Sequence, residues 1–198
     1  MRRMRLLGGA GAAAVLVLVA VAVDAGAADD GVDLGSWTPA PATLAVDGTT
    51  GAAHRCASAA TDAETVLAEQ RGSFRLLVSV DHAHVRSCLL AGDAVVASVV
   101  GPPATAPGPG SAGVSVLGYA GAAVDRDHVT VTYGYAGGDV DAVVVARPDG
   151  LDVEATVTDG WWVAWWPGVP EDDAVLRVLG PEPASTPLVQ AYRRSQAQ

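Results

Sequence analysis

The stretch LDVEATVTDGWWVAWWPG, residues 151–168, decides the fold class. Within it, apolar and polar residues alternate over 151–158, which is the period of a strand with one buried face. The pair Asp159-Gly160 is typical of a two-residue hairpin turn. The tryptophan-rich run 161–166 then returns as a second strand. The stretch therefore predicts an antiparallel β-hairpin that carries large aromatic side chains.

Short strand patterns extend from this hairpin through most of the chain. Four apolar runs separated by turn residues predict an antiparallel meander at 65–71, 74–80, 84–90 and 94–100. Further runs predict strands at 114–119, 128–135, 140–147 and 174–179, an edge strand at 188–192 and a short helix at 50–60. The predicted fold is mainly β: an antiparallel β-sandwich-like ectodomain, as one body or two small lobes, with a short helix, after an N-terminal hydrophobic helix.

Composition divides the chain into segments. A Pro/Gly-rich stretch predicts a linker between two halves, because proline and glycine disfavour both ladders and helices. An acidic and then proline-containing stretch after the N-terminal segment is interpreted as a tether. The predicted segments are an N-terminal hydrophobic segment (1–27), the tether (28–48), the helix and meander (49–100), the linker (101–113), a β-rich half with the tryptophans (114–192) and a polar tail (193–198).

The N-terminal segment has the residue order of a secretory signal. Arginines within residues 1–5 precede the uncharged run 6–23, and Ala25 and Ala27 offer a small-residue cleavage site. The apolar run is also just long enough to span a bilayer, so a retained anchor helix is the alternative. Both interpretations place the remaining chain outside the cytoplasm, secreted or anchored to the cell membrane, with membrane contact only through this segment.

The acidic charge balance excludes one class of partner. The chain has 12 basic and 22 acidic residues, a formal net charge of -10. Nucleic-acid binding needs clustered basic side chains that neutralise phosphates, and isolated arginines in an acidic chain do not provide them. No nucleic-acid partner is therefore predicted.

The two cysteines, Cys56 and Cys88, both lie in the part predicted to be exported. In an oxidising compartment an even number of cysteines favours a disulfide. The alternative is a pair of buried free thiols, and spacing alone does not decide between them.

The tryptophan cluster has a structural and a functional interpretation. On a strand, Trp161 and Trp165 share one face, while Trp162 and Trp166 share the other. Large aromatic side chains at these positions can form core that anchors the second half. Alternatively they form a binding surface, with Trp162 and Trp166 exposed to stack on the sugar rings of a cell-wall glycan.

One histidine pair is a weak metal candidate. His82 and His84 are two residues apart on an extended segment and would point the same way, as zinc or copper ligands do. Asp81, His54 or Cys56 would complete the shell; the alternative is an ordinary solvated turn. No cofactor and no catalytic residue are predicted, because the chain has no serine elbow and no phosphate-binding glycine loop. A metal-assisted hydrolase is kept as an alternative function.

The pattern DGxxVxAxVxDGWWVAWWPG, at 149–168, resembles a C-terminal segment of uncharacterised exported or membrane-anchored actinobacterial proteins. Arg71-Gly72-x-Phe74 and Cys88-Leu89 resemble the first half of the same proteins. The resemblance covers about 67–168 without the linker. It implies an N-terminal hydrophobic segment and a β-rich ectodomain, and it implies no activity.

Together these features predict an extracytoplasmic, non-catalytic interaction module at the cell envelope. The expected partner is an envelope protein or a cell-wall glycan, the latter bound through the tryptophan cluster.

Overall fold

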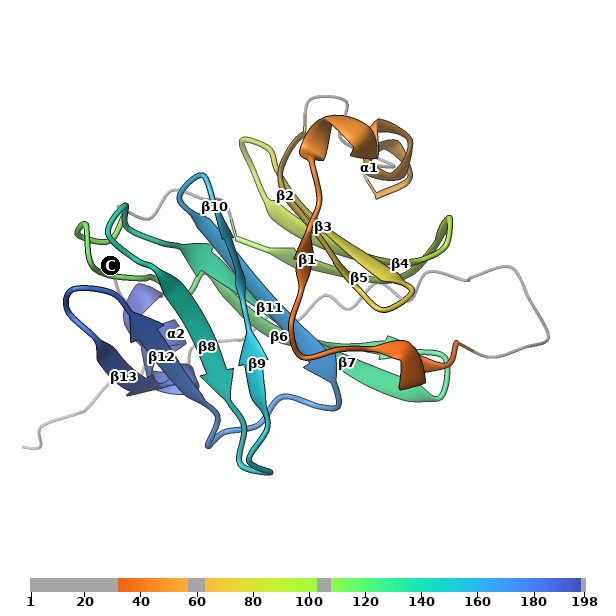
Figure 1. Cartoon of the computed structure of the whole chain (residues 1–198). Coiled ribbons are helices and arrows are strands. Elements are labelled where there is room, and N and C mark those ends of the chain that lie inside the picture. Colours follow the sequence, from red (N-terminus) through yellow and green to blue (C-terminus); the bar gives the residue numbers. More distant parts are fainter. Residues whose placement is uncertain (1–31, 57–62, 103–107, 197–198) are drawn as a thin grey trace, which may run out of the picture.

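The computed structural model describes residues 32–56, 63–102 and 108–196. The predicted signal or anchor segment lies outside these residues, as do 57–62, 103–107 and 197–198. Three antiparallel sheets and two α-helices are found in the described part (Figure 1). Neither helix there has the length and apolar character needed to span a bilayer. The mainly β fold class is confirmed.

The first sheet contains the predicted meander, in the strand order β1-β2-β3-β4-β5. Its strands are β1 (Ala42–Thr43), β2 (Glu64–Arg71), β3 (Phe74–Val80), β4 (Val85–Ala91) and β5 (Ala94–Gly101). The turns β2–β3 and β4–β5 each place a glycine at a φ of 58°, Gly72 and Gly92. A positive φ of this size favours glycine, which explains why both hairpins turn where the sequence indicates. Helix α1 (Thr50–Cys56) packs on this sheet.

The second half of the chain forms two sheets. The middle sheet has the order β10-β11-β7-β6, and the outer sheet has the order β13-β12-β8-β9. The middle strands are β6 (Gly118–Val124), β7 (Asp127–Tyr135), β10 (Thr156–Thr158) and β11 (Trp161–Pro167). The outer strands are β8 (Ala142–Ala146), β9 (Asp152–Glu154), β12 (Val175–Leu179) and β13 (Ala184–Pro187).

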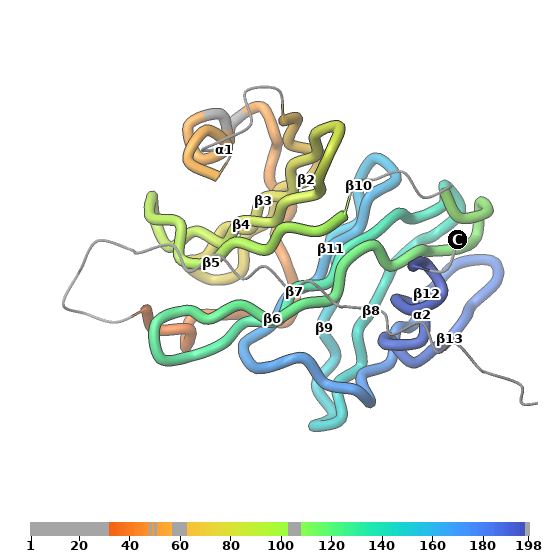
Figure 2. Tube along the Cα trace, turned by 180° about the vertical axis from the view of Figure 1, so that it is seen from behind, coloured from red at the N-terminus to blue at the C-terminus, as the bar shows by residue number. Residues whose placement is uncertain are grey.

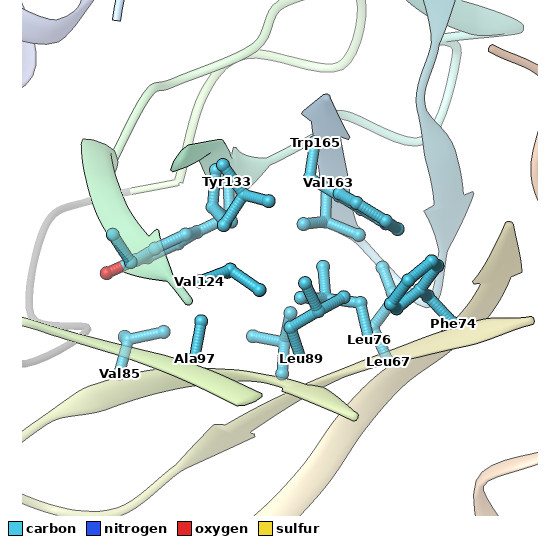
Figure 3. Close-up of a cluster of buried hydrophobic side chains, with 14 of the residues drawn as sticks. Leu67, Phe74, Leu76, Val85, Leu89, Ala97, Val124, Tyr133, Val163 and Trp165 are labelled. Carbon is cyan, nitrogen blue, oxygen red and sulfur yellow. The ribbon is translucent and has the colours of Figure 1, made fainter. Parts of the chain in front are cut away.

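One apolar core joins the two halves. Side chains of the first sheet, such as Leu76 and Leu89, face side chains of the middle sheet, such as Val131, Val163 and Trp165 (Figure 3). All of these residues are buried. The halves therefore form one body, with the first sheet stacked on the middle sheet.

A second apolar core lies between the middle and outer sheets. Trp162, Ala164 and Trp166 contribute from β11, and Val145 and Leu176 contribute from β8 and β12. The middle sheet is consequently buried on both faces. This explains why β11 carries apolar residues at successive positions instead of alternating with polar ones.

The predicted strand 151–158 is in fact two strands in different sheets. β9 pairs with β8 in the outer sheet, whereas β10 pairs with β11 in the middle sheet. The chain changes sheet at Ala155. The Asp159-Gly160 hairpin turn is confirmed, with φ angles of 47° and 78° that match the left-handed conformation of a type I′ turn.

The predicted edge strand 188–192 is wrong, because this segment begins helix α2 (Leu188–Ser195). Leu188, Ala191 and Tyr192 recur at helical spacing, and all three pack against the second core. The helix also includes the first half of the predicted polar tail, residues 193–195.

The predicted strand 114–119 is displaced. Val114 makes only an isolated bridge with Ala136, and the strand β6 runs over Gly118–Val124. A Cβ atom at Gly118 would lie 2.3 Å from the Tyr133 ring, so only glycine fits against this aromatic side chain. The low side-chain volume of β6 therefore reflects close packing, although it weakens the strand signal.

Residues 32–48 are not the free tether that the sequence predicts. They include the short 3-10 helices at Leu34–Ser36 and Val46–Thr49 and strand β1, which pairs with β2. Figures 1 and 2 show this segment, in orange, crossing from the level of the middle sheet to the first sheet. We call residues 32–44 the N-terminal strap.

The predicted linker also contributes structure in its second part. Ser111 and Gly113 accept backbone hydrogen bonds from Asp139 (2.8 Å) and Gly137 (2.8 Å). This part of the linker is therefore held against the chain between β7 and β8.

Candidate functional site

The tryptophan cluster is core, which corrects its interpretation as a binding surface. Trp162, Trp165 and Trp166 are 0% exposed, and only Trp161 is partly exposed. The reason is the third layer: the outer sheet covers the face of β11 that the sequence left open to a ligand. Trp162 and Trp166 therefore present no ring to a glycan. Trp161 contacts Tyr135 at the margin of the first core, with ring centroids 4.5 Å apart and ring planes tilted by 57°.

Trp37 fastens the strap to the body. Its indole N–H donates to the backbone oxygen of Trp165 at 3.2 Å, and its ring meets the Trp165 ring edge-on at 6.3 Å. Gly72 allows the strap to pass closely, since a Cβ atom there would lie 1.8 Å from the Ser36 oxygen. Trp37 therefore docks the strap on the body through an internal contact.

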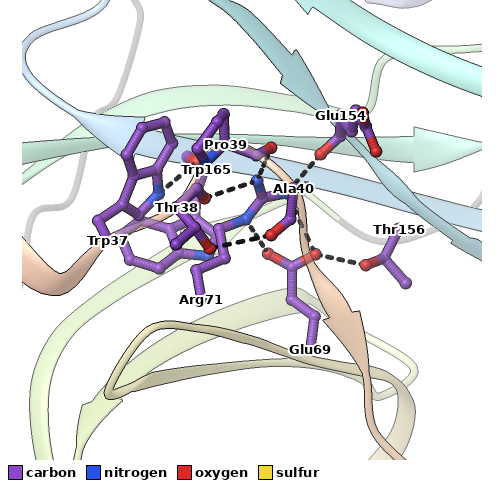
Figure 4. Close-up of polar contacts among 9 residues, drawn as sticks. All are labelled: Trp37, Thr38, Pro39, Ala40, Glu69, Arg71, Glu154, Thr156 and Trp165. Carbon is purple, nitrogen blue, oxygen red and sulfur yellow. Dashed lines mark hydrogen bonds and ion pairs between the residues drawn. The ribbon is translucent and has the colours of Figure 1, made fainter.

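A buried ion pair joins the strap to two sheets (Figure 4). Arg71 Nε donates to Glu69 Oε1 at 2.7 Å, and both side chains have no exposed surface. The guanidinium also donates to the backbone oxygens of Pro39 and Glu154, each at 2.5 Å. Thr156 Oγ1 donates to the other carboxylate oxygen of Glu69 at 2.6 Å.

The Arg71–Glu69 ion pair and its hydrogen-bonding partners, which we call the Arg71–Glu69 joint, hold the segment where the chain changes sheet. Glu154 ends β9 and Thr156 begins β10, so the joint holds both sides of Ala155 and the strap against β2. The charges neutralise each other, and the carboxylate and guanidinium both have hydrogen-bonding partners. Replacing such a pair by apolar residues is often neutral for stability, whereas removing one partner alone is strongly destabilising because it leaves a buried uncompensated charge.

Sequence reasoning missed this joint, although a signal was present. Leu67, Glu69 and Arg71 lie at alternate positions of β2, so two charged residues continue an inward-facing row that begins with leucine. An oppositely charged pair at inward positions of a strand indicates a buried ion pair.

Cys56 and Cys88 are brought together by α1 and β4. Both are buried free thiols in the structure, and their side chains are in hydrogen-bonding contact. That contact, together with burial, raises the pKa of the Cys56 thiol above its ordinary value. The Cys88 thiol also contacts Ser98 Oγ at 3.9 Å. The structure therefore shows the proximity that a disulfide needs, and the disulfide itself stays a prediction.

The histidine pair lies in a turn organised by Asp81. The Asp81 carboxylate accepts backbone hydrogen bonds from Ala83 (2.6 Å) and His84 (2.7 Å), which lower the pKa of this carboxyl group. His84 Nδ1 lies 3.8 Å from the same carboxylate. Among the residues that the structure describes, no three histidine, cysteine or acidic side chains are grouped to hold a metal ion. The geometry is that of a β-turn capped by an aspartate.

The surface feature with binding chemistry is the edge of the first sheet. Strand β5 pairs only with β4 within the described ranges, and it contains no charged residue. It is eight residues long and mostly half-buried. The other sheet edges in that part of the chain are short, as in β1, β9 and β10, carry Pro187, as in β13, or are built from glycine and alanine, as in β6.

Comparisons with known proteins found no match: no family model, no curated protein and no solved structure is similar to this chain at a significant level. The candidate site is thus defined by the chain's own geometry. Its parts are the β5 edge, Cys88 on the neighbouring strand β4, and helix α1, which covers Cys88 and ends at Cys56.

Proposed function

We propose that this protein is an extracytoplasmic, non-catalytic interaction module of the cell envelope. The signal-like order of residues 1–27 supports export, as a secreted or an anchored protein. The resemblance to uncharacterised exported actinobacterial proteins belongs to the same proposal. The observation that carries the interaction role is the edge strand β5.

The proposed binding mode is strand addition to β5. A long edge strand without charges is a template for an extended segment, which gains main-chain hydrogen bonds and packs alternate side chains. Natural proteins usually protect such edges with charge, proline or short length, and the edge strands β1, β9, β10 and β13 follow that practice. The edge strands β5 and β6 have none of these features, and β5 is the longer of the two and contains four valines, whereas β6 is mostly glycine and alanine. A partner segment that pairs with β5 would cover this edge.

The proposed occupant is an extended, β-branched and neutral or basic segment of another envelope protein. A second copy of this chain is less suitable, because each copy has a formal net charge of -10 and would repel the other. A neutral or basic segment meets no such repulsion.

The test is photo-cross-linking in the native envelope, with a photo-reactive residue at Val100 of β5. We expect one dominant envelope protein to be cross-linked and to be recovered with the tagged protein. Val100→Lys should abolish its recovery, because a charge at the edge opposes strand addition. Ser185→Lys on the edge strand β13 is the matched control, which adds the same charge to another sheet and should retain the partner.

Two results would contradict the proposal. Equal recovery with Val100→Lys and Ser185→Lys would exclude β5 as the surface. Absence of any cross-linked protein would exclude a protein partner, and co-sedimentation with purified cell-wall glycan would then test the remaining aromatic surface at Trp161. Both lysine variants must keep the wild-type circular dichroism spectrum for these comparisons.

A Cys56–Cys88 disulfide is part of the proposed function. Export exposes the thiols to oxidants, and the contact between the two buried side chains supports their pairing. In the chain-entropy model the closed loop would stabilise the fold by about 3–4 kcal/mol.

A further inference from the structure

Helix α1 covers the outer face of the first sheet with small side chains. Ala52, Ala53 and Cys56 are its contributions to a third, minor core, which also contains Leu77 and Leu90 of the sheet. Small side chains bury little apolar area, and apolar area determines most of the free energy that holds an element in place. The two main cores are instead filled by tryptophan, tyrosine, phenylalanine and leucine.

The two ends of α1 are held unequally. Its N-terminal side follows β1, which pairs with β2, and Leu44 N–H donates to the Ala68 oxygen at 2.9 Å. In the described part of the chain, its C-terminal side contacts the sheet's β4–β5 turn through Arg55, which lies 2.7 Å from the Asp93 carboxylate. The Asp93 side chain is 84% exposed, so water and salt screen this ion pair.

The two thiols lie at the C-terminal end of α1, one on the helix and the other on the sheet beneath it. Cys56 is the last residue of α1 and is 4% exposed, and Cys88 is 1% exposed on β4. Thiol chemistry requires a thiolate that the reagent can reach. With α1 in place neither sulfur is accessible, so no reagent can attack either one until the cover moves.

We propose that α1 is a lid that opens locally, about its strap-side end, to admit thiol reagents to Cys56 and Cys88. This inference rests on the proposed function only where it concerns the disulfide. In the open state, one cysteine thiolate attacks a small disulfide such as oxidised glutathione, which gives a mixed disulfide and releases one thiol. When α1 closes, the other cysteine attacks this mixed disulfide, releases the second thiol and joins the two sulfurs. The two cysteines lose two protons and two electrons, and the oxidant is reduced to two thiols. The new bond then latches the lid onto β4.

Local opening has a lower free-energy cost than unfolding of the body. Within the described residues, lifting α1 exposes the minor core and breaks the exposed Arg55–Asp93 ion pair, whereas global unfolding also exposes both main cores. Thiol reactivity should therefore follow the stability of α1 and be insensitive to the stability of other elements.

The test measures the alkylation rate of the reduced full-length protein by iodoacetamide under native conditions. Ala52→Gly weakens α1, and we expect about fivefold faster alkylation from the change in helix propensity. Ala191→Gly makes the same chemical change in α2, which lies against the second core, and should leave the rate unchanged. A second, milder comparison uses Arg55→Ala, which removes the exposed ion pair and should make alkylation about two- to fivefold faster. Its control is Arg126→Ala on the β6–β7 turn, which should leave the alkylation rate unchanged.

Equal acceleration by Ala52→Gly and Ala191→Gly would overturn the lid, because it would mean that the thiols react only after global unfolding. Unchanged rates in both α1 variants would also overturn it. The disulfide is measured separately, as loss of two hydrogens in intact mass after incubation with oxidised glutathione. Its absence would contradict the proposed disulfide, while the alkylation result would still decide the lid.

Discussion

Arg71 shows how one residue can be central to a fold without being conspicuous in the sequence. Its guanidinium reaches Glu69 on the same strand, Pro39 in the strap and Glu154 beside the sheet change. The neighbouring Gly72 permits the close passage of the strap, and Phe74 packs edge-on against Trp165 at 6.0 Å. The residues of the pattern Arg71-Gly72-x-Phe74 thus connect the first sheet to the strap, to β9 of the outer sheet and to Trp165 of the middle sheet.

At this scale we predict strong coupling between Arg71 and Glu69. Arg71→Met should lower the free energy of unfolding by about 3–5 kcal/mol, because it leaves a buried carboxylate without its countercharge. The double variant Glu69→Gln/Arg71→Met should lose less than Arg71→Met alone, since an amide needs no countercharge. Urea denaturation measures both values. A double variant as unstable as the sum of the two single variants would argue that the charges do not interact.

At the scale of elements, the same apolar spacing can lead to different structures. Residues 151–158 have the alternation of one strand, yet the chain bends at Ala155 and serves two sheets. Residues 188–192 resemble a short edge strand, yet Leu188, Ala191 and Tyr192 form one face of a helix on the second core. In both cases the packing of neighbouring layers, and not the local apolar spacing, determines the secondary structure and the sheet that a short segment adopts.

For α2 we predict that Leu188 anchors the helix. Leu188→Ala should destabilise the protein by about 2–5 kcal/mol, because this side chain is fully buried in the second core. Leu179→Ala is the matched control: Leu179 ends β12 and is 46% exposed, and surface changes usually cost less than about 0.5 kcal/mol. Urea denaturation compares the two. Similar losses would indicate that α2 contributes little to the core.

At the scale of the whole molecule, the middle sheet joins the two halves of the chain. It packs on the first sheet through one core and on the outer sheet through the other. The strap crosses the joint between the first two layers and is held there by Trp37 and by the Arg71–Glu69 pair. The chain is therefore one stacked β body, and the two-lobe alternative is not observed.

This arrangement predicts a single cooperative unfolding transition. Tryptophan fluorescence reports on both main cores, since Trp165 lies in the shared core and Trp162 and Trp166 lie in the second core, and far-UV circular dichroism reports on all the strands. Because loss of either half exposes the shared core, the two signals should change at the same urea concentration. Separate midpoints would indicate two independently folding units and would contradict the shared core.

The sequence alone was sufficient for the meander strands β2 to β5 and for the Asp159-Gly160 hairpin. These features depend on alternation and on turn residues, which are local properties of the chain. The nearness of Cys56 and Cys88 agrees with the sequence argument from an even number of cysteines, while the disulfide itself stays a prediction.

The tertiary structure decided which faces are covered. Trp162 and Trp166 became core because the outer sheet lies on them, and Glu69 and Arg71 could be buried because the strap and β9 supply acceptors. The position of β5 at the edge of the first sheet likewise follows from the order of strands in space. Burial and pairing depend on residues far apart in the chain, and the alternation within a single strand contains no information about what will lie against it.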